Sequence, residues 1–159
     1  MDDADQKLLR ETFRLAWAAR ERGDRPFGAL VADATGVVLA AAHDSVVTDR
    51  DPVAHAELGV IRAVRGLHDR ARLRRCTLYA SAEPCAMCAG AIFWSGIGRV
   101  VFGMSMTRLH ETMGRGGGEG RLTVPCRGVF ACARPLVEVV GPVFQAEAQE
   151  CHRGYWQAG

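Results

Sequence analysis

The first part of the chain places apolar residues at the spacing of a helix that buries one face. Across residues 5–22, Leu9, Phe13 and Ala16 recur on that face, and Gly23 follows as a helix stop. Two short apolar runs come next, at residues 27–33 and 36–42, with Gly36 in the turn between them. The pattern therefore predicts an amphipathic helix followed by two strands.

Farther along, short apolar runs alternate with helical patterns. Asp51 and Pro52 predict a helix running to about residue 67, because Asp caps a helix and Pro fits its first turn. Further strands are predicted at residues 76–80, 100–102 and 136–140, and further helices at residues 84–96 and 142–156; residues 103–128 are the least regular part. This order predicts a single α/β domain over residues 1–159, a three-layer α/β/α sandwich around a central mixed sheet of about five strands.

The composition favours a cytoplasmic globular domain. The 159 residues suit one compact core, and no apolar run approaches the roughly 20 residues that span a bilayer. The acidic N-terminus lacks the basic start and apolar stretch of a signal peptide. A net charge of +2 gives no overall attraction to nucleic acid or membrane, and we interpret the arginines of residues 62–75 as a solvated surface rather than an RNA-binding patch.

Two of the six cysteines, Cys85 and Cys88, lie three positions apart at a predicted helix start. Residues at that spacing share one helix face, so both sulfurs can reach one metal ion, and the helix N-terminus favours thiolates over thiols. His55, near the start of another predicted helix, supplies a third ligand. The fourth position of a tetrahedral Zn²⁺ is then left for water, as in catalytic zinc sites. We therefore predict one Zn²⁺ per chain, bound by His55, Cys85 and Cys88.

Glu57 lies two positions after His55 and is the predicted catalytic residue. Zinc lowers the pKa of a bound water to roughly 7, and a nearby carboxylate can accept its proton and deliver protons to a ring nitrogen and a departing amine. A His-x-Glu motif followed by Pro-Cys-x-x-Cys is the known signature of zinc deaminases. The residues thus predict hydrolytic deamination.

Other interpretations of these residues stay open. Cys85 and Cys88 alone also fit a redox pair. A structural zinc site would need a fourth protein ligand, and no candidate lies at ligand spacing. Those candidates are Cys76, Cys126, Cys132, Cys151 and His152. We expect these four cysteines to be small buried hydrophobic residues.

With these motifs placed, the chain resembles the cytidine deaminase superfamily, in the branch of guanine deaminases and bacterial tRNA adenosine deaminases. The resemblance covers roughly residues 8–105. It is carried by Pro26-Phe27-Gly28-Ala29, Asp51-Pro52-Val53-Ala54-His55-Ala56-Glu57, Thr77-Leu78-Tyr79, Glu83-Pro84-Cys85-Ala86-Met87-Cys88-Ala89-Gly90-Ala91-Ile92 and Arg99-Val100-Val101-Phe102-Gly103. It implies the fold predicted above and a homodimer.

The resemblance also implies the substrate-binding residues. Phe27 stands where the tRNA enzymes usually carry valine, and Trp94 stands where guanine deaminases also carry tryptophan. As aromatic residues, the two can sandwich a planar base. The alternative is that both belong to the core. By the same resemblance, the backbone N–H of Ala56 contacts the substrate and the carbonyl of Glu83 lies near the leaving amine.

The C-terminal segment gives a further expectation. Residues 143–155 contain Glu147 and Glu150 but only one arginine, Arg153, whereas binding of tRNA favours basic residues. In similar guanine deaminases this segment crosses to the partner subunit and caps its active site, which Tyr155 and Trp156 could do here.

Asp44 is a departure from the family pattern, which has an asparagine that hydrogen-bonds the base at this position. An ionised aspartate offers only acceptors, so Asp44 would favour ring N–H or amino groups. Guanine then competes with isocytosine-, triazine- or pterin-like rings as the substrate. The alternative is that Asp44 caps the turn after the second strand. His110, Glu111 and the glycine-rich residues 115–120 are further candidates for substrate contact or a lid, or for an ordinary surface loop.

The predicted function is a zinc-dependent hydrolytic deaminase of a free nucleobase or related heterocycle, with nucleic acid an unlikely partner. One alternative is a tRNA wobble-adenosine deaminase. The other is a non-catalytic zinc-binding module, against which Glu57 argues, since a structural site has no use for that carboxylate.

Overall fold

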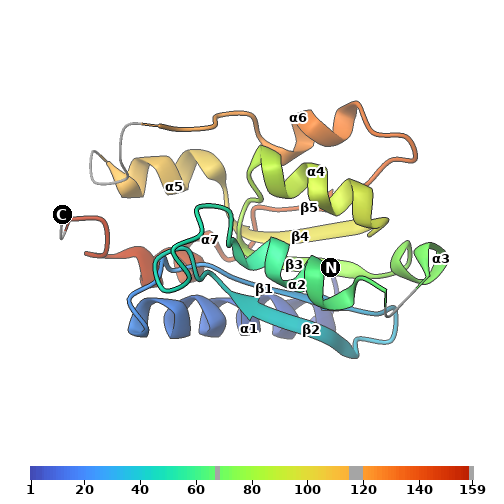
Figure 1. Cartoon of the computed structure of the whole chain (residues 1–159), viewed down its shortest axis with the longest axis horizontal. Coiled ribbons are helices and arrows are strands. Elements are labelled where there is room, and N and C mark those ends of the chain that lie inside the picture. The colour runs from blue at the N-terminus through green and yellow to red at the C-terminus, as the bar shows by residue number, and fades with distance from the viewer. Residues whose placement is uncertain (67–68, 115–119, 158–159) are drawn as a thin grey trace.

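The computed structural model describes residues 1–66, 69–114 and 120–157, and Figure 1 shows the arrangement of its helices and strands. The elements, in chain order, are α1 (Asp3–Glu21), β1 (Gly28–Ala32), β2 (Val38–His43), α2 (Ala56–Val64), α3 (Arg70–Leu73), β3 (Thr77–Ala82), α4 (Ala86–Ser95), β4 (Arg99–Met104), α5 (Met106–Met113), α6 (Cys126–Ala131), β5 (Glu138–Val140), α7 (Gln145–Gln149) and the 3₁₀ helix η1 (Glu150–His152).

The strands form one five-stranded mixed sheet in the order β2-β1-β3-β4-β5. β1 is antiparallel to both β2 and β3, whereas β3, β4 and β5 run parallel. The antiparallel hairpin follows from the short turn at Gly36, and the parallel strands are joined by helical crossovers. The predicted sheet is therefore confirmed.

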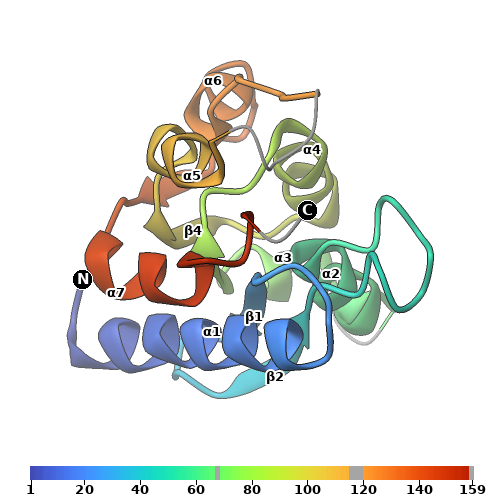
Figure 2. The same ribbon diagram turned by 90° about the vertical axis from the view of Figure 1, so that its left-hand side faces the viewer.

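Helices cover both faces of the sheet, and the alternation of side chains along each strand separates two apolar clusters (Figures 1 and 2). Val31 of β1 packs on the face covered by α2, α4 and α6, whereas its neighbour Leu30 packs on the face covered by α1, α5 and α7. All five residues of β1 are buried, as expected for a strand with helices on both sides. The three-layer α/β/α sandwich is thus confirmed.

An ion pair fixes the start of α1 to the sheet. The Asp5 carboxylate accepts hydrogen bonds from the Arg99 guanidinium at 2.7 and 2.8 Å and from the Tyr79 hydroxyl at 2.6 Å. It also accepts from the backbone N–H of Asp2, which caps the helix in return. The Arg99 hydrogen bonds in particular lower the pKa of Asp5 to about 2. This cluster ties the N-terminal helix to β3 and β4.

Several predicted boundaries were wrong. The helix expected from residue 51 begins at Ala56, because the Asp51 carboxylate accepts from the Val53 N–H at 2.9 Å and holds a turn there. The final helix is broken: Phe144 has a φ of 54°, and only Gln145–Gln149 is α-helical before the 3₁₀ turn. The stretch expected to be least regular contains α5 and α6, and α3 was not predicted. Within the described residues, no helix is both long and apolar enough to cross a membrane.

Candidate metal centre and active-site pocket

Two helix starts carry the predicted metal ligands. His55 is the N-cap residue of α2, Cys85 is the N-cap residue of α4, and Cys88 lies in the first turn of α4. Neither N-cap side chain hydrogen-bonds its own helix, so both are free to face a common point. Because α2 and α4 pack on the same face of the sheet and contact each other, their N-terminal ends bring the three side chains together.

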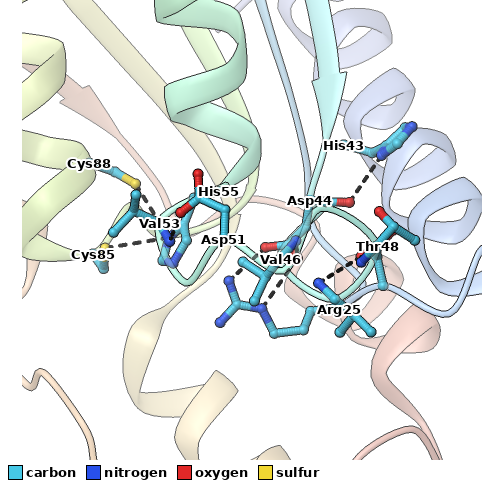
Figure 3. A network of polar contacts seen from close by, with 12 residues as sticks. Arg25, His43, Asp44, Val46, Thr48, Asp51, Val53, His55, Cys85 and Cys88 are labelled. Atoms are coloured by element: carbon cyan, nitrogen blue, oxygen red, sulfur yellow. Dashed lines mark hydrogen bonds and ion pairs between the residues drawn. The ribbon is translucent and has the colours of Figure 1, made fainter.

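The three ligand atoms have the spacing that a tetrahedral zinc requires. The Nδ1 atom of His55 lies 3.5 Å from the Cys88 sulfur and 3.8 Å from the Cys85 sulfur (Figure 3). All three ligand atoms lie within 4.8 Å of one another. Zinc–nitrogen and zinc–sulfur bonds of ordinary length at a tetrahedral angle place nitrogen and sulfur roughly 3.6 Å apart. The residues therefore fit one Zn²⁺, as predicted.

The charges at the centre also fit a divalent cation. Hydrogen bonding from Cys88, and then from His55, lowers the pKa of Cys85 to about 4. The pKa of the Cys88 thiol is raised because it donates to Cys85, because it is buried and because Glu57 is near. A cation held between the sulfurs would stabilise both as thiolates, since metal binding releases protons from its ligands.

Glu57 lies beside this centre in the first turn of α2. Its side chain is buried, and burial raises the pKa of the carboxyl group to about 6. Among the described residues, the cluster of possible ligand atoms contains only His55, Cys85 and Cys88. The centre thus has three protein ligands and an unbound carboxylate next to it, which is the arrangement of a catalytic zinc site.

A cavity of about 210 Å³ opens onto the metal centre. Its walls come from the segment before β1, the N-terminal ends of α2 and α4, helix α5 and the C-terminal segment. The lining residues are Arg25, Phe27, Asp44, His55, Glu57, Ala82, Glu83, Cys85, Met106, Leu109, His110, Met113, Gly120, Arg121, Leu122 and Trp156. The cavity therefore brings together the metal centre, Glu57 and three of the predicted substrate-binding residues, Phe27, Asp44 and Glu83.

Asp44 lies in this cavity but is not a free acceptor. The side chain is fully buried, and Arg25 donates to it from Nη2 at 2.7 Å and from Nε at 3.3 Å. The backbone N–H of Val46 donates to the same carboxylate at 3.1 Å, as in the turn-capping alternative. Arg25 thus balances the charge of Asp44 and already donates to both of its oxygens, whereas the expectation that Asp44 selects substrate N–H groups stays a prediction.

Arg25 was missed by the sequence reasoning. The signal was an aspartate in place of a neutral asparagine, since a buried carboxylate needs a cation nearby. Arg25 is two residues before Phe27 and directly precedes the Pro26-Phe27-Gly28-Ala29 motif.

Trp94 does not lie in the cavity. Its side chain is 76% exposed near the C-terminal end of α4, so within this chain Trp94 does not form the predicted sandwich with Phe27. The second aromatic residue of the cavity is Trp156 of the same chain: it is buried, and its ring centroid lies 6.1 Å from that of Phe27 at a tilt of 49°, so the two rings pack against each other. The C-terminal segment thus covers the pocket of its own chain in this structure, whereas the resemblance placed it over a partner's.

The remaining predicted residues divide between the pocket and the scaffold. Ala56 is the buried first residue of α2, and its proposed backbone contact stays a prediction. The Glu83 carboxylate accepts from the backbone N–H groups of Met106 at 2.9 Å and Cys126 at 3.0 Å, so it joins α5 and α6. His110 lines the cavity, whereas Glu111 pairs with Arg108 outside it.

The glycine-rich segment lies mostly outside the described residues, which omit residues 115–119; Gly120 lines the cavity. Cys76, Cys126 and Cys151 are buried as predicted, but Cys132 is exposed.

This fold, with its three-ligand centre, adjacent buried carboxylate and small pocket, defines a zinc hydrolase of the deaminase class. Residues 2–104 match the family model described as the cytidine and deoxycytidylate deaminase zinc-binding region. The chain belongs to this family, and it is a hydrolytic deaminase with a zinc cofactor.

Known members of the family act on several substrates. The chain is 40% identical over its whole length to a probable cytosine deaminase of Schizosaccharomyces pombe, covering 96% of that protein. It is 39% identical to the tRNA-specific adenosine deaminase of Haemophilus influenzae over 64% of this chain and 58% of the relative. Among solved structures, the guanine deaminase of Nitrosomonas europaea superimposes with a TM-score of 0.75 and 26% identity, over 95% of this chain and 84% of that one.

Proposed function

We propose that this deaminase removes an exocyclic amino group, as ammonia, from a free nucleobase or a closely related heterocycle. The observation that carries the proposal is the small cavity, which is lined by the metal ligands His55 and Cys85, by Glu57 and by the aromatic residues Phe27 and Trp156. Its volume of about 210 Å³ lies below the roughly 300–1,000 Å³ of pockets for drug-sized ligands. A pocket of this size takes a single ring system.

The residues of the pocket divide the chemistry among them. Zinc, when bound, would supply hydroxide near neutral pH by lowering the pKa of a water molecule. Glu57, buried beside the ligands, accepts a proton and delivers protons to the ring nitrogen and the leaving amine. Phe27 and Trp156 line the cavity and present apolar ring surface to the substrate. A pKa of Glu57 raised by burial suits a group that must both take up and release a proton near neutrality.

The second candidate function is deamination of adenosine in tRNA. It is favoured by the similarity to tRNA-specific adenosine deaminases, which covers about three-fifths of this chain. The similarity to the probable cytosine deaminase extends through the C-terminal segment that carries Trp156. That difference in extent supports a free base over tRNA.

The test is ammonia release by zinc-loaded protein from a panel of substrates. The panel contains cytosine, isocytosine, guanine, adenine, aminotriazines, pterins, their nucleosides and an anticodon stem-loop, and Glu57→Ala serves as the blank. We expect ammonia release from at least one free base, and we expect the Glu57→Ala protein to release none. Release from the stem-loop alone would replace the free-base proposal by the tRNA function.

We further infer a homodimer that buries the exposed face of α4. Trp94 is 76% exposed there, and its ring packs edge-on against that of the half-buried Phe93. An exposed tryptophan beside a half-buried phenylalanine forms apolar surface of the kind that a partner subunit covers. Sedimentation velocity should give twice the chain mass of 17.2 kDa for the unmodified protein and the single mass for Trp94→Glu. Trp17→Glu, an equivalent change at an exposed tryptophan of α1, should leave the dimer intact.

A further inference from the structure

The polar wall of the pocket is built by Arg25 and Asp44, which come from separate loops 19 positions apart in sequence. Figure 3 shows the Arg25 side chain reaching across to the carboxylate of Asp44. Both carboxylate oxygens accept hydrogen bonds from the protein, one from Nη2 of Arg25 and the other from Nε of Arg25 and the Val46 N–H. Asp44 is also fully buried, so it presents little of itself to a ligand.

Arg25, by contrast, keeps donor capacity on the side of the cavity. Its guanidinium uses Nε and Nη2 on Asp44, and among the described residues no protein acceptor takes a hydrogen bond from Nη1. The side chain is 27% exposed and lines the cavity together with His55 and Glu57. The Phe27 ring lies 5.7 Å from the centre of the guanidinium and helps to hold its plane. The wall therefore presents a fixed guanidinium donor, whose charge Asp44 balances from behind.

We propose that Arg25 determines specificity by donating to a ring carbonyl of the substrate. The pocket then selects amino-oxo heterocycles over amines that lack the carbonyl, and Asp44 is a positioning residue that acts through Arg25. The inference rests on the proposed function, because it names the substrate class of the same pocket. A ring without the carbonyl offers at most a ring nitrogen at that edge, set back from the position of the carbonyl oxygen, so it pairs poorly with this donor, which corresponds to a loss of about tenfold or more in binding.

Arginine can only donate hydrogen bonds, so it favours substrates that present an acceptor. A guanidinium stays charged at any accessible pH and has no acceptor, so it cannot receive a hydrogen bond from a ring N–H or an amino group. An asparagine at position 44 without Arg25 could pair with either kind of substrate group, because its side chain both donates and accepts hydrogen bonds. The pair of Arg25 and Asp44 thus narrows the choice to substrates with an acceptor at that edge.

The experiment compares matched ligands that differ in the ring carbonyl. The pairs are cytosine with 4-aminopyrimidine and isocytosine with 2-aminopyrimidine. Binding is measured by calorimetry with the zinc-loaded Glu57→Gln protein, and ammonia release is measured with Glu57 intact. Each measurement is made once with Arg25 unchanged and once with the Arg25→Lys substitution. The lysine keeps the positive charge beside Asp44 but loses the forked donor.

We expect Arg25→Lys to weaken binding of the oxo member of a pair by about tenfold or more and to change binding of the oxo-free member by less than about twofold. Arg22→Lys, in the same loop but 55% exposed and away from the cavity, is the matched control and should change neither. If Arg25→Lys does not fold, the double variant Arg25→Gln, Asp44→Ala removes both charges. It too should weaken binding of the oxo member and leave binding of the oxo-free member nearly unchanged. Equal loss for both members, or no loss, would overturn the proposal.

The two readouts separate this inference from the proposed function. Binding that is selective for the oxo member and depends on Arg25, with no ammonia from any ligand, would refute deamination of these bases but support the recognition by Arg25. Ammonia released from both members with no effect of Arg25→Lys would support deamination and overturn the recognition. Absence of both binding and turnover for every oxo base would also overturn it.

Discussion

His152 is a buried histidine that should make the stability of the fold depend on pH. Its side chain is 1% exposed, and its Nδ1 accepts a hydrogen bond from Nε1 of Trp156 at 3.2 Å. Among the described residues, no partner lies near the other ring nitrogen, Nε2. Burial, and then the charge of Arg20, lowers the pKa of His152 to about 4. The ring is therefore neutral in the fold at pH values where an unfolded chain is already protonated.

The sign and size of the change in the free energy of unfolding follow from the difference in the pKa of His152 between the folded and the unfolded chain. An unfolded histidine binds its proton near pH 6.5, so stability is complete above that pH and is lost as the pH falls from 6.5 towards 4. With a folded pKa of about 4, the loss between pH 7.5 and pH 5 amounts to about 2 kcal/mol from this one group.

Urea unfolding at several pH values measures this contribution. His152→Asn keeps an acceptor near the position of Nδ1 but cannot be protonated, so it should lose about 2 kcal/mol less than the unmodified chain between pH 7.5 and pH 5. Both proteins carry the same metal ligands, so the effect of pH on zinc binding cancels in the difference. Parallel loss of stability in the two proteins would refute the argument.

Three further predictions concern other parts of the molecule. Asp5→Asn should lower stability by about 2 kcal/mol at neutral pH, and the unmodified chain should lose that advantage as the pH falls from 3.8 towards 2; thermal unfolding at pH 7 and pH 2.5 tests this, and an equal difference at both would contradict it. Cys88→Ser should abolish stoichiometric zinc in metal analysis, whereas Cys132→Ser, at the exposed cysteine, should retain it. Trp156→Ala should weaken binding of the free base by about tenfold, as loss of an aromatic contact implies, whereas Trp17→Ala should leave binding unchanged. Equal binding by the two variants would show that Trp156 does not contact the base.

The sequence was most informative where function depends on local spacing. Cys85 and Cys88 are one helical turn apart, and His55 and Glu57 share the start of another helix, so the metal centre could be predicted from short motifs. The fold class could also be predicted, because runs of buried β residues alternate with helices. Exact helix starts could not, since side chains such as Asp51 hold turns that propensity alone does not reveal.

The walls of the pocket could not be predicted in the same way. The pairing of Arg25 with Asp44 depends on two loops that meet only in the folded chain. The choice between Trp94 and Trp156 depends on which helix face is covered. On α4, Ile92 is buried, and Trp94, two positions later, lies about 200° around the helix and is exposed. That periodicity was available in the sequence, whereas the position of the C-terminal segment over the pocket was not.

The central claim is that the His55, Cys85 and Cys88 centre, with Glu57, replaces an amino group by an oxygen atom from water. The most direct measurement is the mass of the product formed in water labelled with heavy oxygen, together with the ammonia released. We expect one labelled oxygen and one ammonia for each product molecule, and neither from Glu57→Ala. Ammonia without incorporation of the label, or equal activity of Glu57→Ala, would contradict it.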